Sequence, residues 1–251
     1  MIYRFFVAGT DTGVGKTLIS SALLCKAGQQ GYATFGLKPV AAGCIGEPPT
    51  NRDALLLQRH SSVQLDYDWH NPVALRAAIA PHIAAEQEGC AQSLQLPSLT
   101  ERCENSLTKA LETRGEPGVD SWQLVEGAGG WMVPLNHQHT LADLALSLGT
   151  PVILVVGIRL GCINHALLSV QAIQSRGLKI AGWVANSLSP DMEAEKNNLE
   201  FLTQAMQNAR VPLLGRVPYN PDLDIEESDT EHFLPTPADI ERVAEFLTLP
   251  N

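Results

Sequence analysis

The stretch Gly9-Thr10-Asp11-Thr12-Gly13-Val14-Gly15-Lys16-Thr17 decides the fold of this chain. It follows a short apolar run at 5–8 and precedes an apolar run of helical period at 18–24. Glycines let a backbone wrap closely around phosphate oxygens, and the N–H groups that open a helix carry the positive end of its dipole. Lys16 offers a point charge to β- and γ-phosphates, and the Thr17 hydroxyl can ligate Mg²⁺. The stretch therefore predicts a phosphate-binding loop (P-loop).

One position departs from the usual pattern of such loops. The common pattern has a glycine where this chain has Thr10, and Gly9 stands one residue earlier. A tight turn followed by a surface lysine is the alternative interpretation. The strand-like run before the loop and the helical run after it favour a phosphate loop, because this is the context that the motif requires.

Outward from the loop, short β-branched or aromatic runs alternate with longer segments of helical period. This alternation is typical of a parallel sheet covered by helices on both faces. We expect one α/β domain over residues 1–251, with a doubly wound, mostly parallel sheet that binds ligands at the carboxyl ends of its strands. The expected strands are 3–8, 32–37, 122–125, 152–156, 180–185 and 213–217, and the expected helices are 17–30, 53–59, 99–113, 141–148, 163–176, 192–208 and 238–247.

Composition excludes several classes of function. The 17 Lys and Arg residues against 27 Asp and Glu give a net charge of −10, which leaves no basic surface for nucleic acid or an anionic membrane. The five cysteines form no CxxC pair, so neither a zinc site nor a redox dithiol is expected. The apolar runs at 5–8 and 152–156 are too short for a signal peptide or a membrane helix. We therefore expect a cytoplasmic protein.

Three segments interrupt the alternation of strands and helices. The segments 43–50 and 68–95 contain prolines and only weak periodicity, and such long connections are usually binding loops or disordered. The acidic segment 222–231 is most simply a solvated loop.

Two carboxylates are candidates to hold magnesium beside the phosphate loop. Glu126 ends the expected strand 122–125 and enters the small-residue turn Gly127-Ala128-Gly129-Gly130, which brings it to the same edge of the sheet as the loop. A solvated glutamate before a turn is the alternative. Asp53 begins the expected helix 53–59, where the helix dipole alone would also favour it, and its spacing does not decide between the two roles.

Lys38 and Asn186 follow two other expected strands. Pro39 disfavours a helical conformation at Lys38, so this lysine leaves its strand extended and points into the crevice that holds Lys16. Two lysines above one phosphate chain suit phosphoryl transfer, which depends mainly on positioning and on stabilising charge. Asn186 can read an adenine edge with its amide, although a turn role is equally consistent with its position.

In their order and spacing these segments resemble the dethiobiotin synthetase family. The resemblance covers most of the chain and weakens after about residue 219. Besides the phosphate loop and Asp53-Ala-Leu, it rests on Lys38-Pro-Val-Ala-Ala-Gly43, Val125-Glu-Gly-Ala-Gly-Gly-Trp131, Leu160-Gly-Cys-Ile-Asn-His165, Gly182-Trp-Val-Ala-Asn186 and Gly215-Arg-Val-Pro218.

The resemblance implies an enzyme of biotin synthesis that uses ATP and Mg²⁺. Its substrates would be 7,8-diaminopelargonic acid and CO₂ or bicarbonate, and its products dethiobiotin, ADP and phosphate. The reaction would pass through a carbamate and a carbamic–phosphoric anhydride. The family is homodimeric, and the carboxylate tail of the substrate reaches the partner subunit.

The resemblance also implies roles for individual residues. Lys16 and Lys38 would be catalytic, and Thr17, Asp53 and Glu126 would hold Mg²⁺. ATP would also contact Thr12, Gly13, Val14, Gly15, Leu18, Gly127, Ala128, Gly129, Asn186, Ser187, Pro218 and Tyr219, and the substrate would contact Lys38, Ala42, Gly161, Cys162 and Asn164.

The chain departs from the family at two of these positions. Ala42 stands where many members have a substrate-binding serine, so that hydroxyl contact is absent or replaced. Gly13 stands where some members have an acidic residue, which removes a carboxylate near the phosphates and can loosen nucleotide discrimination.

Two other classes of protein share the phosphate loop. Amide ligases of cobalamin synthesis usually append a glutaminase domain, for which 251 residues leave no room. ParA- or MinD-like switch ATPases carry an extra lysine where this chain has Asp11, and those that bind membranes end in a basic helix, whereas the segment 239–245 is acidic. ATP turnover that requires diaminopelargonic acid would separate a synthetase from a switch.

Overall fold

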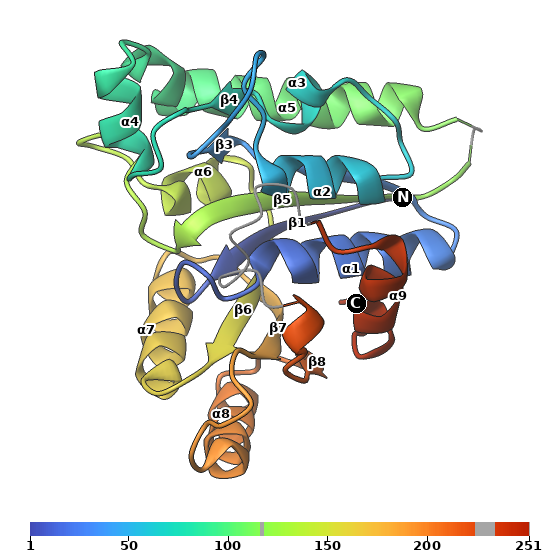
Figure 1. Cartoon of the computed structure of the whole chain (residues 1–251), viewed down its shortest axis with the longest axis vertical. Coiled ribbons are helices and arrows are strands. Elements are labelled where there is room, and N and C mark those ends of the chain that lie inside the picture. Colours follow the sequence, from blue (N-terminus) through green and yellow to red (C-terminus); the bar gives the residue numbers. More distant parts are fainter. Residues whose placement is uncertain (116–117, 224–233, 251) are drawn as a thin grey trace.

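The structure is a computed structural model that describes residues 1–115, 118–223 and 234–250. Its centre is a six-stranded sheet in the order β2-β5-β1-β6-β7-β8, in which every pair of neighbours is parallel (Figure 1). The strands are β1 (Ile2–Gly9), β2 (Ala33–Leu37), β5 (Ser121–Gly130), β6 (Val152–Ile158), β7 (Ile180–Ser187) and β8 (Leu213–Val217). The six strands expected from the sequence are thus confirmed.

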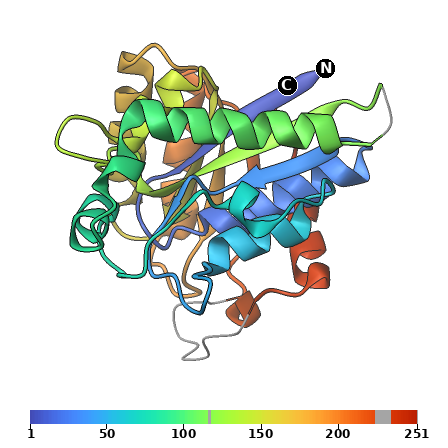
Figure 2. The ribbon, with the colours of Figure 1, turned by 90° about the horizontal axis from the view of Figure 1, so that it is seen from above.

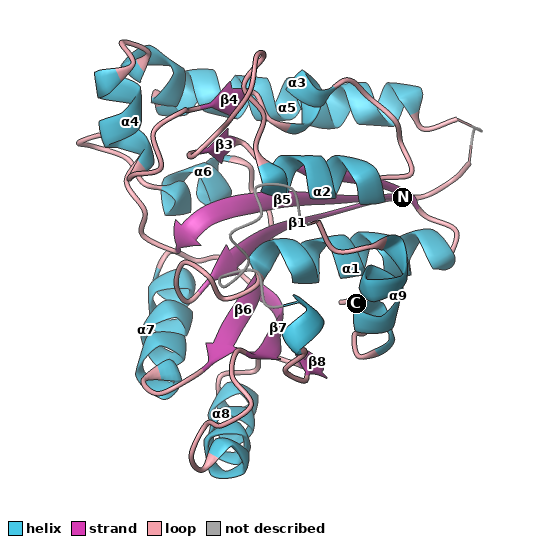
Figure 3. Cartoon of the chain, viewed as in Figure 1, coloured by secondary structure: helices cyan, strands magenta, loops and turns pink. Residues whose placement is uncertain are grey.

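Helices cover both faces of the sheet (Figure 3). One face packs on α1 (Lys16–Gln29), α2 (Arg52–His60) and α9 (Pro237–Glu245). The other face packs on α5 (Leu96–Thr113), α6 (Leu141–Ser147), α7 (Cys162–Ser175) and α8 (Glu195–Asn208). Figure 2 shows the same division from above, with α5 on one side of β2 and with α1 and α2 on the other. The expected doubly wound α/β fold is confirmed.

The alternation of side chains along β1 explains why two cores form. Phe5 and Val7 point to the face that carries α1, and Phe6 and Ala8 point to the opposite face. All four side chains are buried, which accounts for the continuous apolar run in the sequence.

The direction of winding reverses at β1, and this positions the site. After β1 the chain forms β2 and later β5, which lies between β1 and β2 in the sheet. Strands β6, β7 and β8 lie on the other side of β1. In open α/β sheets, ligands bind outside the carboxyl ends of the strands where the order reverses. The phosphate loop lies at this point, because it connects β1 to α1.

The ends of two helices test the sequence-based boundaries. Helix α9 begins at Pro237, one residue before the expected start, and the Thr236 hydroxyl caps it by accepting a hydrogen bond from the Asp239 amide at 3.3 Å. Helix α8 begins at Glu195 instead of residue 192, because Ala194 has a left-handed backbone with φ 57° that helical residues do not adopt.

The segment 68–95 contains regular structure, so the expectation of a long loop is wrong in this respect. It forms part of α3 (Tyr67–His70), β4 (Val73–Ala74), α4 (Pro81–Gln87) and the 3₁₀ helix η1 (Ala91–Leu94), and β4 pairs in parallel with β3 (Val40–Ala41). These elements are too short to produce a clear period. Buried apolar residues anchor them instead, namely Leu75, Ala84, Ala85 and Leu94.

Three further expectations concern segments and chemistry outside the sheet. The segment 43–50 is a turn closed by an antiparallel bridge between Ile45 and Thr50. A 3₁₀ helix, η2 (Pro221–Leu223), includes the start of the acidic segment 222–231, and the remainder of that segment lies outside the described residues. All five cysteines are free thiols. Within the described ranges, no helix is both long enough and apolar enough to cross a bilayer.

Candidate active site

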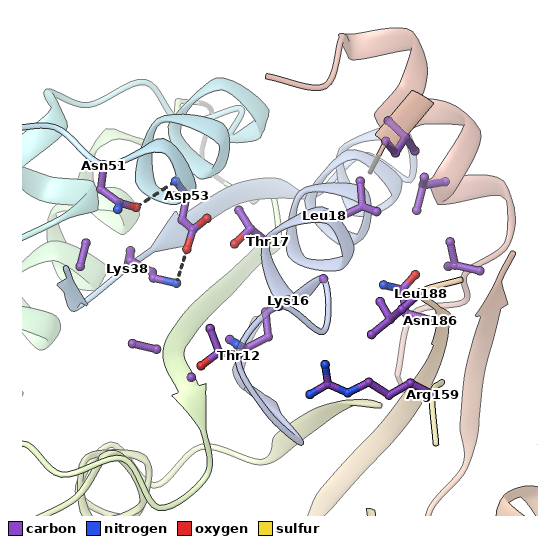
Figure 4. Close-up of a pocket in the computed structure, with 18 of the residues that line it drawn as sticks. Thr12, Lys16, Thr17, Leu18, Lys38, Asn51, Asp53, Arg159, Asn186 and Leu188 are labelled. Atoms are coloured by element: carbon purple, nitrogen blue, oxygen red, sulfur yellow. Dashed lines mark hydrogen bonds and ion pairs between the residues drawn. The ribbon is translucent and has the colours of Figure 1, made fainter. Parts of the chain in front are cut away.

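A cavity of about 1180 Å³ opens at the carboxyl edge of the sheet (Figure 4). Its walls come from the phosphate loop, the start of α2, the segment after β4, the loops after β6, β7 and β8, and α9. Most of the residues expected at the site line it: Thr12, Gly13, Gly15, Lys16, Thr17, Leu18, Lys38, Ala42, Asp53, Ala128, Gly129, Asn186, Ser187, Pro218 and Tyr219.

The phosphate loop is held against the end of β7. Gly15 has φ 83°, a left-handed conformation that favours glycine, and it caps the N-terminus of α1. A Cβ atom at Gly15 would lie 2.3 Å from Asn186 Nδ2, so a side chain does not fit there. Asn186 Nδ2 donates a hydrogen bond of 3.0 Å to the Val14 carbonyl. Asn186 therefore positions the loop and also lines the cavity.

Lys16 lies folded over the loop that carries it. Its Nζ donates to the Asp11 carbonyl at 3.1 Å, and its side chain is buried. Burial, and to a lesser extent the charge of Lys38, lower the pKa of Lys16 to about 8, against the opposing effect of Glu126, Asp53 and Asp11. The ammonium therefore lies in a position where an anionic ligand would stabilise its charge.

Lys38 bridges the two carboxyl groups among the predicted magnesium ligands. Its Nζ lies 2.8 Å from Asp53 Oδ2, 2.7 Å from Glu126 Oε1 and 3.3 Å from the Gly127 carbonyl. Burial alone would lower the pKa of Lys38, but the two carboxylates outweigh burial and raise it. Desolvation raises the pKa of Asp53, but Lys38, together with smaller effects of Thr17 and Lys16, more than reverses this, so the pKa is lowered overall. The ammonium of Lys38 is thus in contact with the carboxyl groups of both Asp53 and Glu126.

A chain of hydrogen bonds fixes Asp53 relative to Lys38. Oδ1 of Asn51 caps α2 by accepting a hydrogen bond from the backbone N–H of Asp53 at 2.9 Å. The backbone N–H of Asn51 donates to the Tyr67 hydroxyl at 2.7 Å. That hydroxyl donates to Asn71 Oδ1 at 2.9 Å, and Asn71 Nδ2 donates to the Lys38 carbonyl at 2.8 Å. The short helix α3 therefore connects the two charged residues.

The oxygen atoms near Lys38 fit a magnesium ion. The Thr17 hydroxyl donates to Glu126 Oε1 at 2.7 Å, and Glu126 is fully buried. Its other oxygen, Oε2, is buried without a hydrogen-bond partner among the described residues. The described residues include no group of three His, Cys, Asp or Glu side chains able to hold a metal alone. Magnesium commonly takes one or two carboxylates and completes its shell with phosphate oxygens and water, so Thr17, Asp53 and Glu126 suit it.

Some expected site residues do not line the cavity. Val14, Glu126 and Gly127 are buried immediately behind its wall. Gly161, Cys162 and Asn164 lie at the N-terminus of α7, where Gly161 and Asn164 are exposed on the surface. The cavity within this chain therefore does not include the segment expected to bind a carboxylate tail.

Other cavity residues were not identified from the sequence. Asn51 has a recognisable signal, since an asparagine before an acidic first turn is a typical helix N-cap. Arg159 directly follows a strand, as Lys38 does. Arginines are common on protein surfaces, so this position alone does not indicate a site residue. The remaining residues have no motif, because they enter from weakly patterned segments or from α9; they include Ala78, Ile79, Ala80, Pro81, Leu188, Ser189, Arg242, Val243 and Phe246.

The first strand of the parallel sheet ends in a glycine loop, Lys16 and Thr17 open the next helix, and Glu126 on the neighbouring strand accepts a hydrogen bond from Thr17. These features define a P-loop nucleotide-binding protein. The family model described as an AAA domain matches residues 3–227. The ATP-dependent dethiobiotin synthetase BioD of Cellvibrio japonicus is 51% identical over 85% of this chain and 88% of its own length. BioD 1 of Escherichia coli K12 is 46% identical over 87% and 92%. The chain belongs to the dethiobiotin synthetase family, as the sequence motifs indicated.

Solved structures show the same fold at much lower identity. The septum site-determining protein MinD of Pyrococcus horikoshii, complexed with Mg-ADP, has a TM-score of 0.52 and 16% identity, over 98% of this chain and 95% of its own. The cell division ATPase MinD of Pyrococcus furiosus has a TM-score of 0.50 and 18% identity, over 98% of both chains. At this identity the likeness concerns the fold alone.

Proposed function

We propose that this chain is an ATP- and Mg²⁺-dependent dethiobiotin synthetase of biotin synthesis. The observation that carries the proposal is that Lys16, Lys38 and Asp53 line one cavity, with Glu126 bonded to Lys38 behind its wall, in a chain 44–51% identical to synthetases of that name. In the proposed reaction, one amine of 7,8-diaminopelargonic acid adds to CO₂ and loses a proton to give a carbamate.

The next two steps close the ring. A carbamate oxygen attacks the γ-phosphorus of ATP, ADP leaves, and a carbamic–phosphoric anhydride forms. The neighbouring amine then attacks the carbonyl carbon, a C–N bond forms, the C–O bond to phosphate breaks, and the amine loses a proton. The products are the cyclic urea dethiobiotin, ADP and phosphate.

Lys16 and Lys38 are the catalytic cations of this proposal. Lys16 binds the β- and γ-phosphates from the loop, and its lowered pKa is restored by their negative charge. Lys38 lines the same cavity from the end of β2 and orients the carbamate. Preorganised positive charge of this kind stabilises the transferring phosphoryl group because the site does not have to reorganise during the reaction.

Thr17, Asp53 and Glu126 are the proposed magnesium ligands. Asp53 is 41% exposed and therefore reaches the cavity, and Glu126 has an unpartnered buried oxygen. When bound, magnesium would neutralise charge on the phosphate oxygens. Lys38 contacts both carboxyl groups and so holds them close to each other.

The two ends of the cavity suggest where each substrate binds. Asn186, Ser187, Pro218 and Tyr219 lie beyond the loop on the β7 and β8 side, which suits the adenine. Ala42, Ala78 and Ile79 lie on the side of β2, and their apolar side chains suit the hydrocarbon part of the diamine.

The carboxylate tail of the diamine is proposed to bind a second copy of the chain. Gly161, Cys162 and Asn164 open α7, a helix of 14 residues whose first N–H groups suit a carboxylate. Because these residues do not line the cavity of their own chain, the proposal requires a homodimer. We also propose that the enzyme acts in the cytoplasm.

The decisive experiment is incubation of the pure protein with diaminopelargonic acid, bicarbonate, Mg²⁺ and ATP. Mass analysis should detect dethiobiotin and equimolar ADP. Matched reactions without the diamine, or with Lys38→Met protein, should give neither. ATP hydrolysis that does not depend on the diamine would contradict the proposal.

A further inference from the structure

Arg159 forms an ion pair with the phosphate loop that the reaction described above does not use. It follows β6 and lines the cavity, and its Nη2 lies 2.5 Å from Asp11 Oδ2. The two side chains are 43% and 44% exposed. Figure 4 shows Arg159 extending from its strand toward Thr12 and Lys16. A pair exposed to this degree contributes little to stability, so another role has to explain its position.

Asp11 also connects Arg159 to the catalytic lysine. Its Oδ1 accepts a hydrogen bond from the Thr12 amide at 2.8 Å, and its carbonyl accepts from Lys16 Nζ at 3.1 Å. One loop residue thus holds an ammonium through its backbone and a guanidinium through its side chain. Both cations lie on the wall of the same cavity.

Given the other charges around the cavity, an anionic ligand needs a further cation such as Arg159. Lys38 is already balanced by two carboxylates, and the whole chain carries a net charge of −10, which repels an anionic ligand. An arginine fork binds phosphate oxygens through two parallel hydrogen bonds, and it remains protonated at all working pH values. We propose that Arg159 is a further phosphate-binding residue, which contacts the polyphosphate chain of bound ATP, and that Asp11 is the residue that positions it.

The proposal rests on the proposed function, because it assumes that a triphosphate occupies the loop. Two interpretations of Arg159 have to be separated. If Arg159 touches phosphate, its loss weakens binding whether or not Asp11 is charged. If Arg159 only neutralises Asp11, its loss has little effect once Asp11 is neutral.

A double-mutant cycle separates the two interpretations. The variants are Asp11→Asn, which keeps an oxygen acceptor for the Thr12 amide, Arg159→Gln, and the two combined. Dissociation constants are measured by calorimetry on the full chain, with Mg²⁺ and the non-hydrolysable analogue in which nitrogen joins the β- and γ-phosphates of ATP, and separately with tripolyphosphate. In the Asp11→Asn background, Arg159→Gln should weaken binding of both ligands about tenfold. A loss of threefold or more supports the proposal, and a smaller loss overturns it.

Arg176 provides a matched control. It pairs with Asp143, and neither residue lines the cavity. Arg176→Gln should leave both dissociation constants unchanged, which shows that loss of a surface arginine alone does not weaken binding.

A structure of the wild-type chain with the ATP analogue tests the contact without any variant. The guanidinium of Arg159 should lie within hydrogen-bond distance of a phosphate oxygen. A bound analogue that leaves Arg159 on Asp11 alone would overturn this inference and spare the proposed function. Failure of the wild-type chain to bind the analogue would overturn both.

Discussion

The ammonium of Lys38 lies 2.7 Å from Oε1 of Glu126, and the register of the sheet brings the two together. Leu37 on β2 pairs with Val125 on β5, so Lys38, which follows β2, and Glu126, which lies within β5, are at the same level of the sheet. Both charged groups are buried, and neither can be removed without leaving the other with fewer partners. This relationship governs the first two predictions.

Lys38→Met should remove activity and also stability. Turnover should fall about a hundredfold or more, because a preorganised charge at the transferring group is lost. The free energy of unfolding should fall by about 3–5 kcal/mol, because Glu126 is left buried without its cation. Denaturant titration and a dethiobiotin assay measure the two effects. Lys38→Met combined with Glu126→Gln should recover much of the stability and none of the turnover; recovered turnover would show that Lys38 has no catalytic role.

Glu126→Gln should impair the response to magnesium more than it impairs folding. Lys38 keeps Asp53 as a partner, so the melting temperature should change little, whereas a neutral amide is a poorer ligand for Mg²⁺. Activity measured against Mg²⁺ concentration should reach half its maximum only at a concentration about tenfold higher or more. A large loss of thermal stability with a normal magnesium response would identify Glu126 as a structural carboxylate.

Nucleotide affinity should fall at alkaline pH through Lys16. Its pKa is lowered to about 8 in the free protein, mainly by burial, and bound phosphates would raise it again. Binding therefore takes up a proton above pH 8, and affinity should decrease toward about tenfold per pH unit there, with no contribution from this group well below pH 8. Calorimetry at pH 7, 8 and 9 tests this. Lys16→Arg should bind with a weaker pH dependence, and equal slopes in the two proteins would exclude Lys16 as the titrating group.

Asn51→Ala should show that the cap of α2 supports catalysis. Loss of an N-cap costs about 1 kcal/mol of stability. Here it also removes the side-chain oxygen that accepts a hydrogen bond from the Asp53 amide, whereas the backbone N–H of residue 51 can still donate to Tyr67. Turnover should fall about tenfold. Thr236→Ala removes the corresponding cap of α9 and should cost similar stability with unchanged turnover. Equal losses of turnover in the two variants would mean that the effect of Asn51 is general destabilisation.

The sequence predicted those features that local patterns determine. Buried strands produce continuous apolar runs, and the carboxyl ends of parallel strands share one edge, so the sequence could predict that Lys16 and Lys38 line one cavity and that Glu126 lies beside Lys38. The link from Tyr67 to Asn71 and Lys38 could not be predicted, because it joins side chains across short elements without periodicity. Arg159 was missed for a related reason: its partner Asp11 lies 148 residues away along the chain.

The link through α3 has a consequence for protein engineering. Apart from the N-cap Asn51, the residues that hold Asp53 against Lys38 lie in a segment with no recognisable signature, and α3 itself spans only Tyr67–His70. If only the glycine loop, the lysine and the two acids were transplanted onto another scaffold of this architecture, the reactive groups would be present. The hydrogen-bonded residues that set their spacing would be missing. A successful graft would have to carry residues 51–71 as one unit.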